Sequence, residues 1–545
     1  MPVTFPAHQA VVLPLERRWP ALDGTALCIG SAALDLLYAV LQTPLAFDAH
    51  GPLGVLAWGI PVTLALTALA RGLLYPHAAR WARRAPHFGV GASTVAPMAT
   101  PLPPIGLDAQ EMCQALLRID TTNPPGNEAP AAAYLAGKLR EVGYQPQILE
   151  SAPGRANLVV RRNGNGAAAP LLLTAHLDVV EADAAKWRQP PFSGALVDGC
   201  LWGRGAIDMK NMAAMSAAVM RRLAADEVTL RRDVIFAAVA DEEAGCDHGS
   251  RFLVEQHPAL VTAEYAIGEA GGFSLHLGGK TYYPIQVAEK GICWVRARFT
   301  GDPGHGSMPR PESAVVRLGE GVAALGRTPL PPHATSYVHD FMHALTSQQP
   351  ALARPLMRVL SHPRVLPRIL RLLPDESTRR TFSALVANTA SPTVVRAGAK
   401  INVIPGEAIL EIDGRTLPGQ SEADFLRELR AVLGEDVELE VLRSEPATVT
   451  DPIESPLLEL IRAKILAREP DAVVVPYMIP GFTDAKYFSK TGARWYGFSP
   501  VKLEKASDLR FADMFHGHDE RIPVAGLHWG AELLHDVVLA HCRAG

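Results

Sequence analysis

The stretch Leu171-Leu-Leu-Thr-Ala-His-Leu-Asp-Val179 predicts a buried strand that ends in two chemically active side chains. A short apolar run that follows the polar segment 163–170 is typical of a buried strand in an α/β sheet. His176 and Asp178 then lie near its carboxyl end, where open α/β sheets usually bind their ligands. Residues two positions apart in a strand face the same side, so Asp178 could hold one imidazole nitrogen while the other binds a metal ion. A single histidine at a strand end remains the simpler alternative for this motif alone.

The composition of the 545-residue chain limits the classes of partner. Charged residues make up 20% of the chain and the formal net charge is -4, which gives no reason to expect nucleic acid or acidic polymers. The length favours about two to four domains. The six cysteines are scattered without CxxC spacing, which argues against a zinc knuckle or a disulfide framework and favours a reducing compartment.

Residues 1–86 are predicted to be a membrane-anchoring segment. The stretch 52–70 has no charge and is long enough to cross a hydrocarbon core of roughly 30 Å, whereas 24–43 is similar in length but carries Asp35. Basic residues precede the first stretch and follow the second, so we expect a transmembrane helical hairpin and a membrane-anchored protein with a cytoplasmic catalytic domain. Two buried or interfacial helices are the alternative. Residues 87–106 are rich in Gly, Pro, Ser and Thr and are predicted to be a linker.

Strand and helix signals alternate after the linker, which predicts a layered α/β domain. Helices are expected over 108–117 and 131–142, and a strand is expected over 156–162. The glycine-rich stretch 201–211 fits a tight turn that places Asp208 just before a helix. A carboxylate at this position could bridge two cations, or it could cap that helix.

Acidic side chains also follow the next strand signals. The apolar run 233–240 ends in three acids that include Glu242 and Glu243, and three adjacent acids repel one another unless cations neutralise them. Neighbouring side chains point in opposite directions, so one glutamate could bind a metal ion while the other addresses a water molecule. An exposed acidic loop is the alternative. Glu269 ends another short apolar stretch, and His516 lies near the carboxyl terminus.

The ordered set TAHLD, GRGAIDMKN, DEEAG, IGEAGG and HGHDE resembles the di-zinc metallopeptidase family of aminoacylase, succinyl-diaminopimelate desuccinylase, acetylornithine deacetylase and carboxypeptidase S. The likeness covers about residues 105–545. It implies an α/β catalytic domain with a central mixed sheet flanked by helices, in two parts at 107–289 and 419–545. It also implies an inserted α/β-sandwich lid or dimerisation domain at 290–418. The helical apolar spacing of 335–390 resembles the longer lids of carboxypeptidase S and of its N-acyl-amino-acid hydrolase relatives.

The resemblance also implies the residues of the site. Five side chains become ligands of two zinc ions, with Co²⁺ or Mn²⁺ as substitutes: His176, Asp208 and Glu269 for one ion, and Asp208, Glu243 and His516 for the other. Asp178 becomes the carboxylate behind His176, and Glu242 becomes the general base. A cis peptide bond is implied after the bridging Asp208. The spacing to Glu520 matches the family's H-G-x-x-E pattern and selects His516 rather than His518.

Three residues of the lid are implied to act on the substrate. His305 would steady the oxyanion, often in the partner subunit's active site. Asn402 belongs to an N-x-I-P segment, and Arg415 follows it by the family's interval of thirteen residues, which suits recognition of a substrate carboxylate. A simple turn around His305 and a surface ion pair for Arg415 are the alternatives. Thr483 and Asp484 of the G-x-T-D-A stretch are expected to have a supporting role.

The expected activity is hydrolysis of an amide bond next to a free carboxylate by a zinc-dependent exopeptidase of the carboxypeptidase or dipeptidase type. An N-acyl-amino-acid deacylase of the aminoacylase type shares these residues and is the alternative. An inactive membrane-anchored binding protein is the more remote alternative, because every ligand and base position is filled. The expected partners are a peptide or N-acyl amino acid, the membrane, and a second copy of the chain that contacts the lid.

Overall fold

The computed structural model describes residues 102–504, with gaps at 278, 334, 340 and 342–382, and also residues 509 and 514–544. All elements named below belong to one compact unit, Pro101–Gly545. The predicted membrane hairpin, with helices at 24–43 and 52–70, lies outside the described residues and stays a prediction. Among the residues that are described, no helix has both the length and the apolar character needed to cross a membrane.

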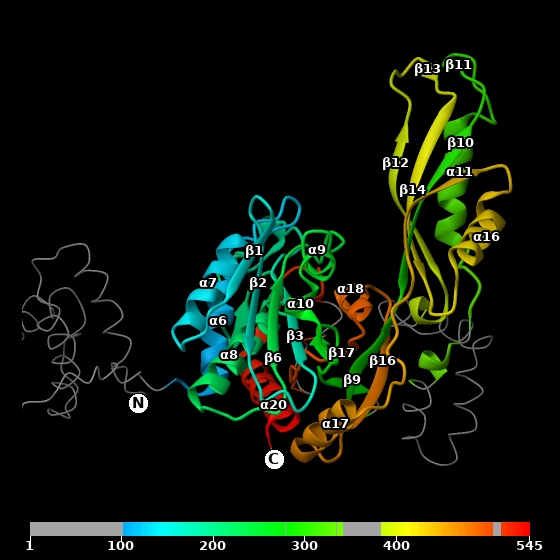
Figure 1. The fold of residues 1–545 in the computed structure, drawn as a ribbon. Helices are drawn as coiled ribbons and strands as arrows, with labels where there is room; N and C mark the ends of the chain where they lie inside the picture. Colours follow the sequence, from blue (N-terminus) through cyan, green and yellow to red (C-terminus); the bar gives the residue numbers. More distant parts are fainter. Residues whose placement is uncertain are drawn as a thin grey trace, which may run out of the picture. The chain divides into compact units, whose positions relative to one another are not determined.

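A mixed sheet forms the centre of the catalytic domain, as the resemblance implied (Figure 1). Within the described residues its strand order is β1-β2-β6-β3-β7-β17-β9-β16, and β8 pairs with β9. The neighbours β6, β3 and β7 are parallel, and β2 pairs with β6 in the antiparallel direction. The strands are β1 (Gln147–Ala152), β2 (Arg155–Arg162), β3 (Leu171–His176), β6 (Val234–Val239), β7 (Tyr265–Gly268), β8 (Leu275–Leu277), β9 (Lys280–Glu289), β16 (Val473–Ile479) and β17 (Arg494–Gly497).

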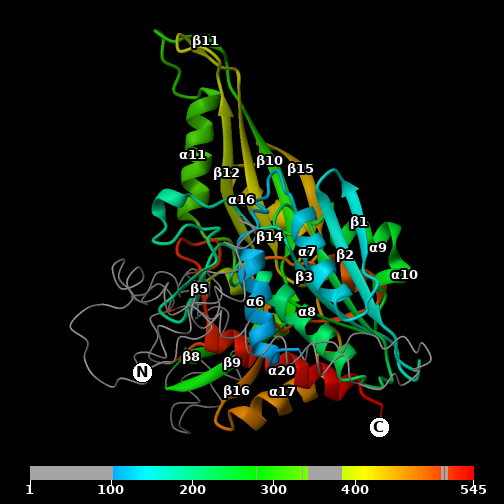
Figure 2. The same cartoon turned by 90° about the vertical axis from the view of Figure 1, so that its left-hand side faces the viewer.

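Helices cover both faces of this sheet, as expected of an α/β layer structure (Figure 2). One face packs against α6 (Ile105–Leu117), α7 (Ala129–Arg140), α8 (Lys210–Ala225), α17 (Pro456–Arg468) and α20 (Val524–Cys542). The other face packs against α9 (Ser250–Gln256), α10 (Pro258–Val261) and α18 (Ala485–Phe488). Helix α8 is buried along almost its whole length, and its many alanines let it fit between the sheet and the outer helices.

A small sheet joins the carboxyl-terminal part of the chain to the turn that carries Asp208. Its order is β18-β5-β4, and its strands are β18 (Arg521–Pro523), β5 (Cys200–Trp202) and β4 (Ala195–Val197). Two 3₁₀ turns, η3 (Ala184–Lys186) and η4 (Ser489–Thr491), complete the catalytic domain. Because β18 pairs with β5, Glu520 lies next to the segment that leads into α8.

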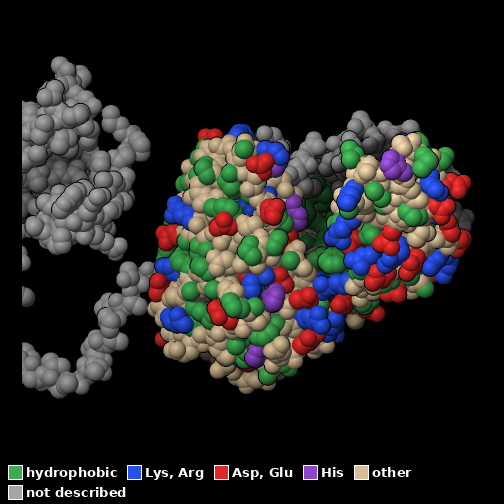
Figure 3. All heavy atoms as spheres, turned by 90° about the horizontal axis from the view of Figure 1, so that it is seen from above, with side chains coloured by type: hydrophobic (Ala, Val, Ile, Leu, Met, Phe, Trp, Pro, Cys, Tyr) green, Lys and Arg blue, Asp and Glu red, His purple; other side chains and the backbone are tan. Residues whose placement is uncertain are grey.

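The lid is a four-stranded antiparallel sheet, in the order β12-β14-β10-β15, with two helices on one face. Its elements are β10 (Gly291–Thr300), β11 (Gly304–His305), α11 (Ala314–Arg327), β12 (Thr389–Ala397), β13 (Val403–Ile404), β14 (Glu407–Thr416), α16 (Glu422–Leu433) and β15 (Glu438–Glu445). Charged side chains of both signs are interspersed on the lid (Figure 3), and cross-strand pairs such as Arg296–Glu411 and Arg298–Glu407 hold them.

The predicted end of the lid at residue 418 is wrong, because the lid continues to Glu445. Strand β15 pairs with β10, and Phe425 and Leu429 of α16 pack into the lid core. Apolar spacing does not say which sheet a strand joins, so the sequence pattern does not locate this boundary. The other predicted domain boundaries stay predictions.

Candidate active site

Three neighbouring parallel strands end at the same edge of the catalytic sheet, and polar residues follow each of them. His176 is the last residue of β3, Glu242 and Glu243 follow β6, and Glu269 directly follows β7. His176 is completely buried, and Glu242 and Glu269 are nearly so. The topology therefore brings four of the predicted site residues together at the carboxyl ends of the strands, where α/β sheets bind ligands.

Asp208 lies between the two predicted histidines. One carboxylate oxygen is 3.1 Å from His176 Nε2, and the other is 3.3 Å from His516 Nε2. Helix α8 has Met209 as its cap and no side-chain cap hydrogen bond, so Asp208 does not cap this helix. The Asp208–Met209 peptide bond is cis, as the resemblance implied. The carboxylate is thus placed where it could bridge two cations.

The distances between the donor atoms fit metal coordination. Glu243 Oε2 lies 3.1 Å from His516 Nε2, and Glu269 Oε2 lies 3.7 Å from His176 Nε2. Ligands about 2.0 to 2.2 Å from a tetrahedral zinc ion are roughly 3.3 Å apart, so these spacings match. The other carboxylate oxygen of Glu269 is buried and has no hydrogen-bond partner within the described part of the chain. The donors are the nitrogen and oxygen atoms that zinc accepts.

Glu242 stands beside these donors. Its Oε2 is 4.0 Å from His176 Nε2. Two donor groups have the spacing to hold an ion: His176, Glu242 and Glu269 form one, and His176, Asp208 and Glu243 form the other. Geometry alone therefore does not separate the predicted base from the predicted ligands.

Asp178 connects His176 to the Glu242–Glu243 turn. It lies in the loop after β3 and not in the strand, because β3 ends at His176. His176 Nδ1 is 2.9 Å from the Asp178 backbone carbonyl oxygen and 3.5 Å from its carboxylate, so the carbonyl is the nearer partner. The Asp178 carboxylate accepts the backbone N–H groups of Glu242 and Glu243, both at 3.1 Å. Asp178 thus positions two strand ends at once.

Glu520 holds the turn that carries Asp208. This carboxylate is completely buried and accepts the backbone N–H groups of Gly205, Ile207 and Asp208. Arg204 Nη1 donates to it at 2.8 Å. Sequence reasoning used Glu520 only to select His516, whereas the structure makes it the main support of the Asp208 backbone.

Asp241 corrects the expectation that cations must neutralise all three acids after β6. Arg155 Nη2 donates to its carboxylate at 2.8 Å, and Asn123 Nδ2 donates at 3.0 Å. Asn123 also donates to Asp178 at 2.8 Å. Sequence reasoning missed Asn123 and Arg155, since the segments that contain them have no pattern pointing to Asp241.

Burial dominates the electrostatics of the cluster. It raises the pKa of Glu242 well above the ordinary value, and it raises the pKa of Glu269 to about 8 despite the nearby His176. Burial alone would also raise the pKa of Asp208, but hydrogen bonds to His176 and His516 hold it below the ordinary value. Hydrogen bonds to Asp208 and Glu243 raise the pKa of His516 to about 10. Such a set of crowded acids gains stability from bound cations.

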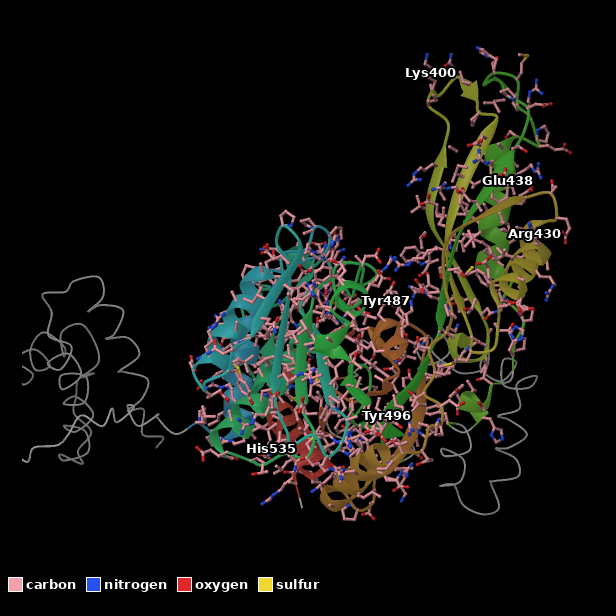
Figure 4. The ribbon with its side chains drawn as sticks, viewed as in Figure 1. Lys400, Arg430, Glu438, Tyr487, Tyr496 and His535 are labelled. Carbon is pink, nitrogen blue, oxygen red and sulfur yellow. The ribbon has the colours of Figure 1, made fainter. Side chains whose placement is uncertain are left out.

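The predicted lid residues are not gathered at this cluster. His305 and Asn402 are exposed and belong to neighbouring segments at the outer end of the lid, near the labelled Lys400 (Figure 4). Among the described residues, the His305 side chain contacts Ser307, with Nδ1 2.7 Å from its hydroxyl oxygen. Arg415 lies at the other end of the lid sheet, where β14 pairs with the start of β10.

Arg415 forms the ion pair that was the alternative to substrate binding, although one of its donors stays unpaired. Its Nε and Nη2 donate to the two carboxylate oxygens of Asp413, at 2.8 and 3.1 Å. Its Nη1 is buried and has no hydrogen-bond partner in the described part of the chain. Thr483 and Asp484 are buried nearby, and the Thr483 hydroxyl donates to Glu289 at 2.7 Å.

Residues 172–540 match the model of Peptidase family M20/M25/M40. The chain belongs to this family. A second model, described as a domain of unknown function (DUF4184), matches residues 1–84. Membership makes this M20 chain a hydrolase of the metallopeptidase and amidohydrolase class, in a family that depends on metal ions.

Named relatives of this M20 chain include peptidases and amidohydrolases. It is 31% identical over 376 residues to the probable carboxypeptidase S-like 2 of Dictyostelium discoideum, which covers 65% of this chain and 68% of the relative. It is 26% identical to human N-fatty-acyl-amino acid synthase/hydrolase PM20D1, over 68% and 73% of the two chains. It is 25% identical to pig aminoacylase-1, over 76% and 91%.

Solved structures share the fold. The M20 metallo-carboxypeptidase Sso-CP2 from Sulfolobus solfataricus superposes with a TM-score of 0.59 at 17% identity, over 79% of this chain and 98% of that one. Human carnosine dipeptidase 1 gives a TM-score of 0.55 at 16% identity, over 80% and 97%. At these identities the likeness concerns the fold alone.

Proposed function

We propose that this M20 chain is a zinc-dependent exopeptidase of the carboxypeptidase or dipeptidase type, which hydrolyses an amide bond next to a free carboxylate. The observation that carries the proposal is the buried cluster at the ends of β3, β6 and β7. It combines His176 with Asp208, Glu243 and Glu269 at coordination distances, and the unpaired Glu269 oxygen calls for a cation.

The proposed ligands fall into two sets that share Asp208: His176, Asp208 and Glu269 in one, and Asp208, Glu243 and His516 in the other. When bound, the zinc ions would polarise the scissile carbonyl and lower the pKa of the attacking water toward neutrality. Co²⁺ and Mn²⁺ accept the same nitrogen and oxygen donors and could substitute.

Glu242 is the proposed general base. Burial raises the pKa of its carboxyl group, which favours proton uptake near neutral pH. It would accept a proton from the attacking water and pass it to the leaving amine. Asp178 keeps the Glu242 backbone in place through its hydrogen bond at 3.1 Å.

The lid residues are proposed to act on the substrate from two chains. Arg415 would bind the free carboxylate of the substrate through its unpaired Nη1, and Asn402 would support substrate binding. His305 is exposed at the outer end of the lid, so we propose that it enters the site of a partner subunit and donates a hydrogen bond to the oxyanion. This requires a homodimer that contacts the lid.

A deacylase of N-acyl amino acids is the second candidate, favoured by the similarity to PM20D1 and aminoacylase-1. The predicted membrane hairpin would hold the catalytic domain at the cytoplasmic face of a membrane, where substrates with long acyl chains partition. Equal hydrolysis rates on short and long acyl chains in the presence of bilayers would contradict this extension.

A panel of N-acyl amino acids and dipeptides tests the proposal. The full chain, loaded with zinc, should release free amino acid from N-acyl amino acids or from dipeptides. The ratio of the hydrolysis rates on these two classes decides between a deacylase and a peptidase. Glu242→Ala is the control and should lose the activity, because it removes the base. A wild-type rate no higher than that of Glu242→Ala on every substrate would refute the proposed function.

A further inference from the structure

Two cations from different domains meet at one aromatic ring beside the catalytic domain. Phe482 belongs to the segment between β16 and α18. Lys486 Nζ lies 3.7 Å from the centroid of its ring, and the guanidinium carbon of Arg415 lies 4.8 Å from the same centroid. Arg415 comes from strand β14 of the lid, whereas Lys486 comes from α18 of the catalytic domain.

Both cations retain donors that nothing in the described part of the chain satisfies. Lys486 is only 5% exposed, and its Nζ has no hydrogen-bond partner there. Arg415 uses two nitrogens on Asp413, while its buried Nη1 has no partner. The favourable contacts with the ring of Phe482 do not use these N–H groups in hydrogen bonds. Buried N–H donors without a partner are costly, so this place favours a ligand with hydrogen-bond acceptor atoms, such as a carboxylate.

The nearby acids leave Lys486 Nζ and Arg415 Nη1 without a hydrogen bond. Glu289 accepts the Thr483 hydroxyl at 2.7 Å and an amide hydrogen from Gln286 at 3.3 Å, and the charge of Lys486 acts on it without a hydrogen bond. Asp413 accepts Nε and Nη2 of Arg415 and the indole N–H of Trp294 at 2.9 Å, so it does not reach Arg415 Nη1. Within the described residues, Lys486 Nζ and Arg415 Nη1 therefore keep N–H groups that a ligand could accept.

The same segment is also a contact between the two domains. Arg443 of β15 in the lid donates to the hydroxyl of Tyr487 at 3.0 Å, and Tyr487 directly follows Lys486. Figure 4 labels Tyr487 on α18. A ligand bound between Lys486 and Arg415 would therefore join the lid and the catalytic domain at a place where they already contact each other.

We propose that Lys486 is a second carboxylate-binding residue, which binds the free carboxylate of the substrate together with Arg415 at the ring of Phe482. This inference rests on the proposed function, because it takes a substrate with a free carboxylate. Arg415 Nη1 would donate to one carboxylate oxygen and Lys486 Nζ to the other. Lys486 then determines specificity for a free carboxylate over the neutral carboxamide.

The test compares an N-acetyl amino acid with its carboxamide on wild type, Lys486→Met and Lys486→Arg. Lys486→Met should lower kcat/KM for the acid by about 10- to 100-fold, mainly through KM, and leave the carboxamide nearly unchanged. Lys486→Arg should keep most of the wild-type kcat/KM for the acid. The matched control is Lys490→Met, since Lys490 also lies over an aromatic ring, that of Tyr487, but is exposed and pairs with Glu445.

The decisive quantity is the ratio of kcat/KM for the acid to kcat/KM for the carboxamide. An unchanged ratio in Lys486→Met would overturn the inference, whether both values stay the same or both fall equally. If Lys486→Met does not fold, Phe482→Leu supplies the second test, because it removes the ring that both cations contact and should also reduce the ratio. If wild type hydrolyses neither compound, the panel that includes dipeptides still decides the proposed function. Calorimetric binding of the same two compounds to wild type and Lys486→Met then still decides the inference.

Discussion

The carboxyl ends of β3, β6 and β7 and the outer end of the lid differ in how their polar side chains are satisfied. At the strand ends, buried acids such as Glu242 and Glu269 crowd around a buried His176. At the outer end of the lid, His305 and Asn402 are exposed, and the His305 ring contacts a neighbour two residues away. The first region gathers buried donors of the kind that cations bind, whereas the second presents exposed side chains to another surface.

This difference separates two kinds of dependence. Residues at the strand ends should depend on metal ions, because buried carboxylates are costly without positive charge. Residues at the outer end of the lid should depend on a second subunit, because they are exposed and lie at the opposite end of the lid from Arg415. Variants of Glu242 and Glu243 measure the dependence on metal ions, and a variant of His305 measures the dependence on a second subunit.

The largest expected effect is at Glu242. Glu242→Gln should lower kcat by about 10²- to 10⁴-fold, because the amide cannot accept a proton, while the zinc content stays unchanged. Glu243→Gln is the matched neighbour and should reduce the zinc content, since Glu243 faces His516 at 3.1 Å. Turnover and zinc analysis of both variants provide the measurement. Loss of zinc in Glu242→Gln would make this residue a ligand.

The next effect concerns His305. His305→Ala should lower kcat by about 10²- to 10³-fold, as expected when one oxyanion donor is lost, while zinc content and folding stay unchanged. Mixing this variant with Glu242→Gln tests the dimer. Mixed dimers would hold one intact site, so subunit exchange should restore about a quarter of the wild-type activity. No recovery after proven exchange would show that His305 does not act across subunits.

A smaller effect is expected for Glu520, which supports the backbone around the proposed ligand Asp208. Glu520→Gln removes the charge that holds the backbone N–H groups around Asp208, so zinc affinity should fall by about 10- to 100-fold. Zinc competition with a chelating dye measures this affinity. Asp519→Asn is the control, because Asp519 binds Arg188 at the surface instead of the Asp208 turn. Equal effects of both variants would contradict the positioning role of Glu520.

The last prediction concerns stability and not activity, at the junction of the two domains. Burial, helped by the charge of Arg415, lowers the pKa of Lys290 from its ordinary value of 10.5 to about 7. Between these pH values the unfolded chain binds more protons than the folded chain, so this group makes the protein more stable as pH rises. Lys290→Met lacks the effect, and its stability advantage over wild type should shrink between pH 7 and 10. Urea unfolding measures it, and a constant difference would contradict the shifted pKa.

The sequence predicted the strand ends well because each site residue follows a short apolar run. His176, Glu242 and Glu269 could be placed at one sheet edge from this pattern, and the structure brings them together. Local patterns did not reveal partners that are distant in sequence. Asn123 and Asp241 are 118 positions apart, and no pattern links them.

The lid was harder to predict, for the same physical reason. Strand β15 joins the lid sheet through pairing with β10, and pairing partners are not encoded in apolar spacing. Arg415 could be assigned either an ion pair or a substrate from its sequence context. The structure shows the pair with Asp413 and also an Nη1 without a hydrogen-bond partner among the described residues, a combination that depends on burial.

The number of zinc ions bound per chain, measured together with hydrolysis during chelation and zinc addition, tests the metal centre itself. We predict about two ions per chain in the full protein, loss of hydrolysis when a chelator removes them, and recovery when zinc is restored. Hydrolysis that persists in metal-free protein would contradict the account, because the buried acids would then act without the cations that their arrangement calls for.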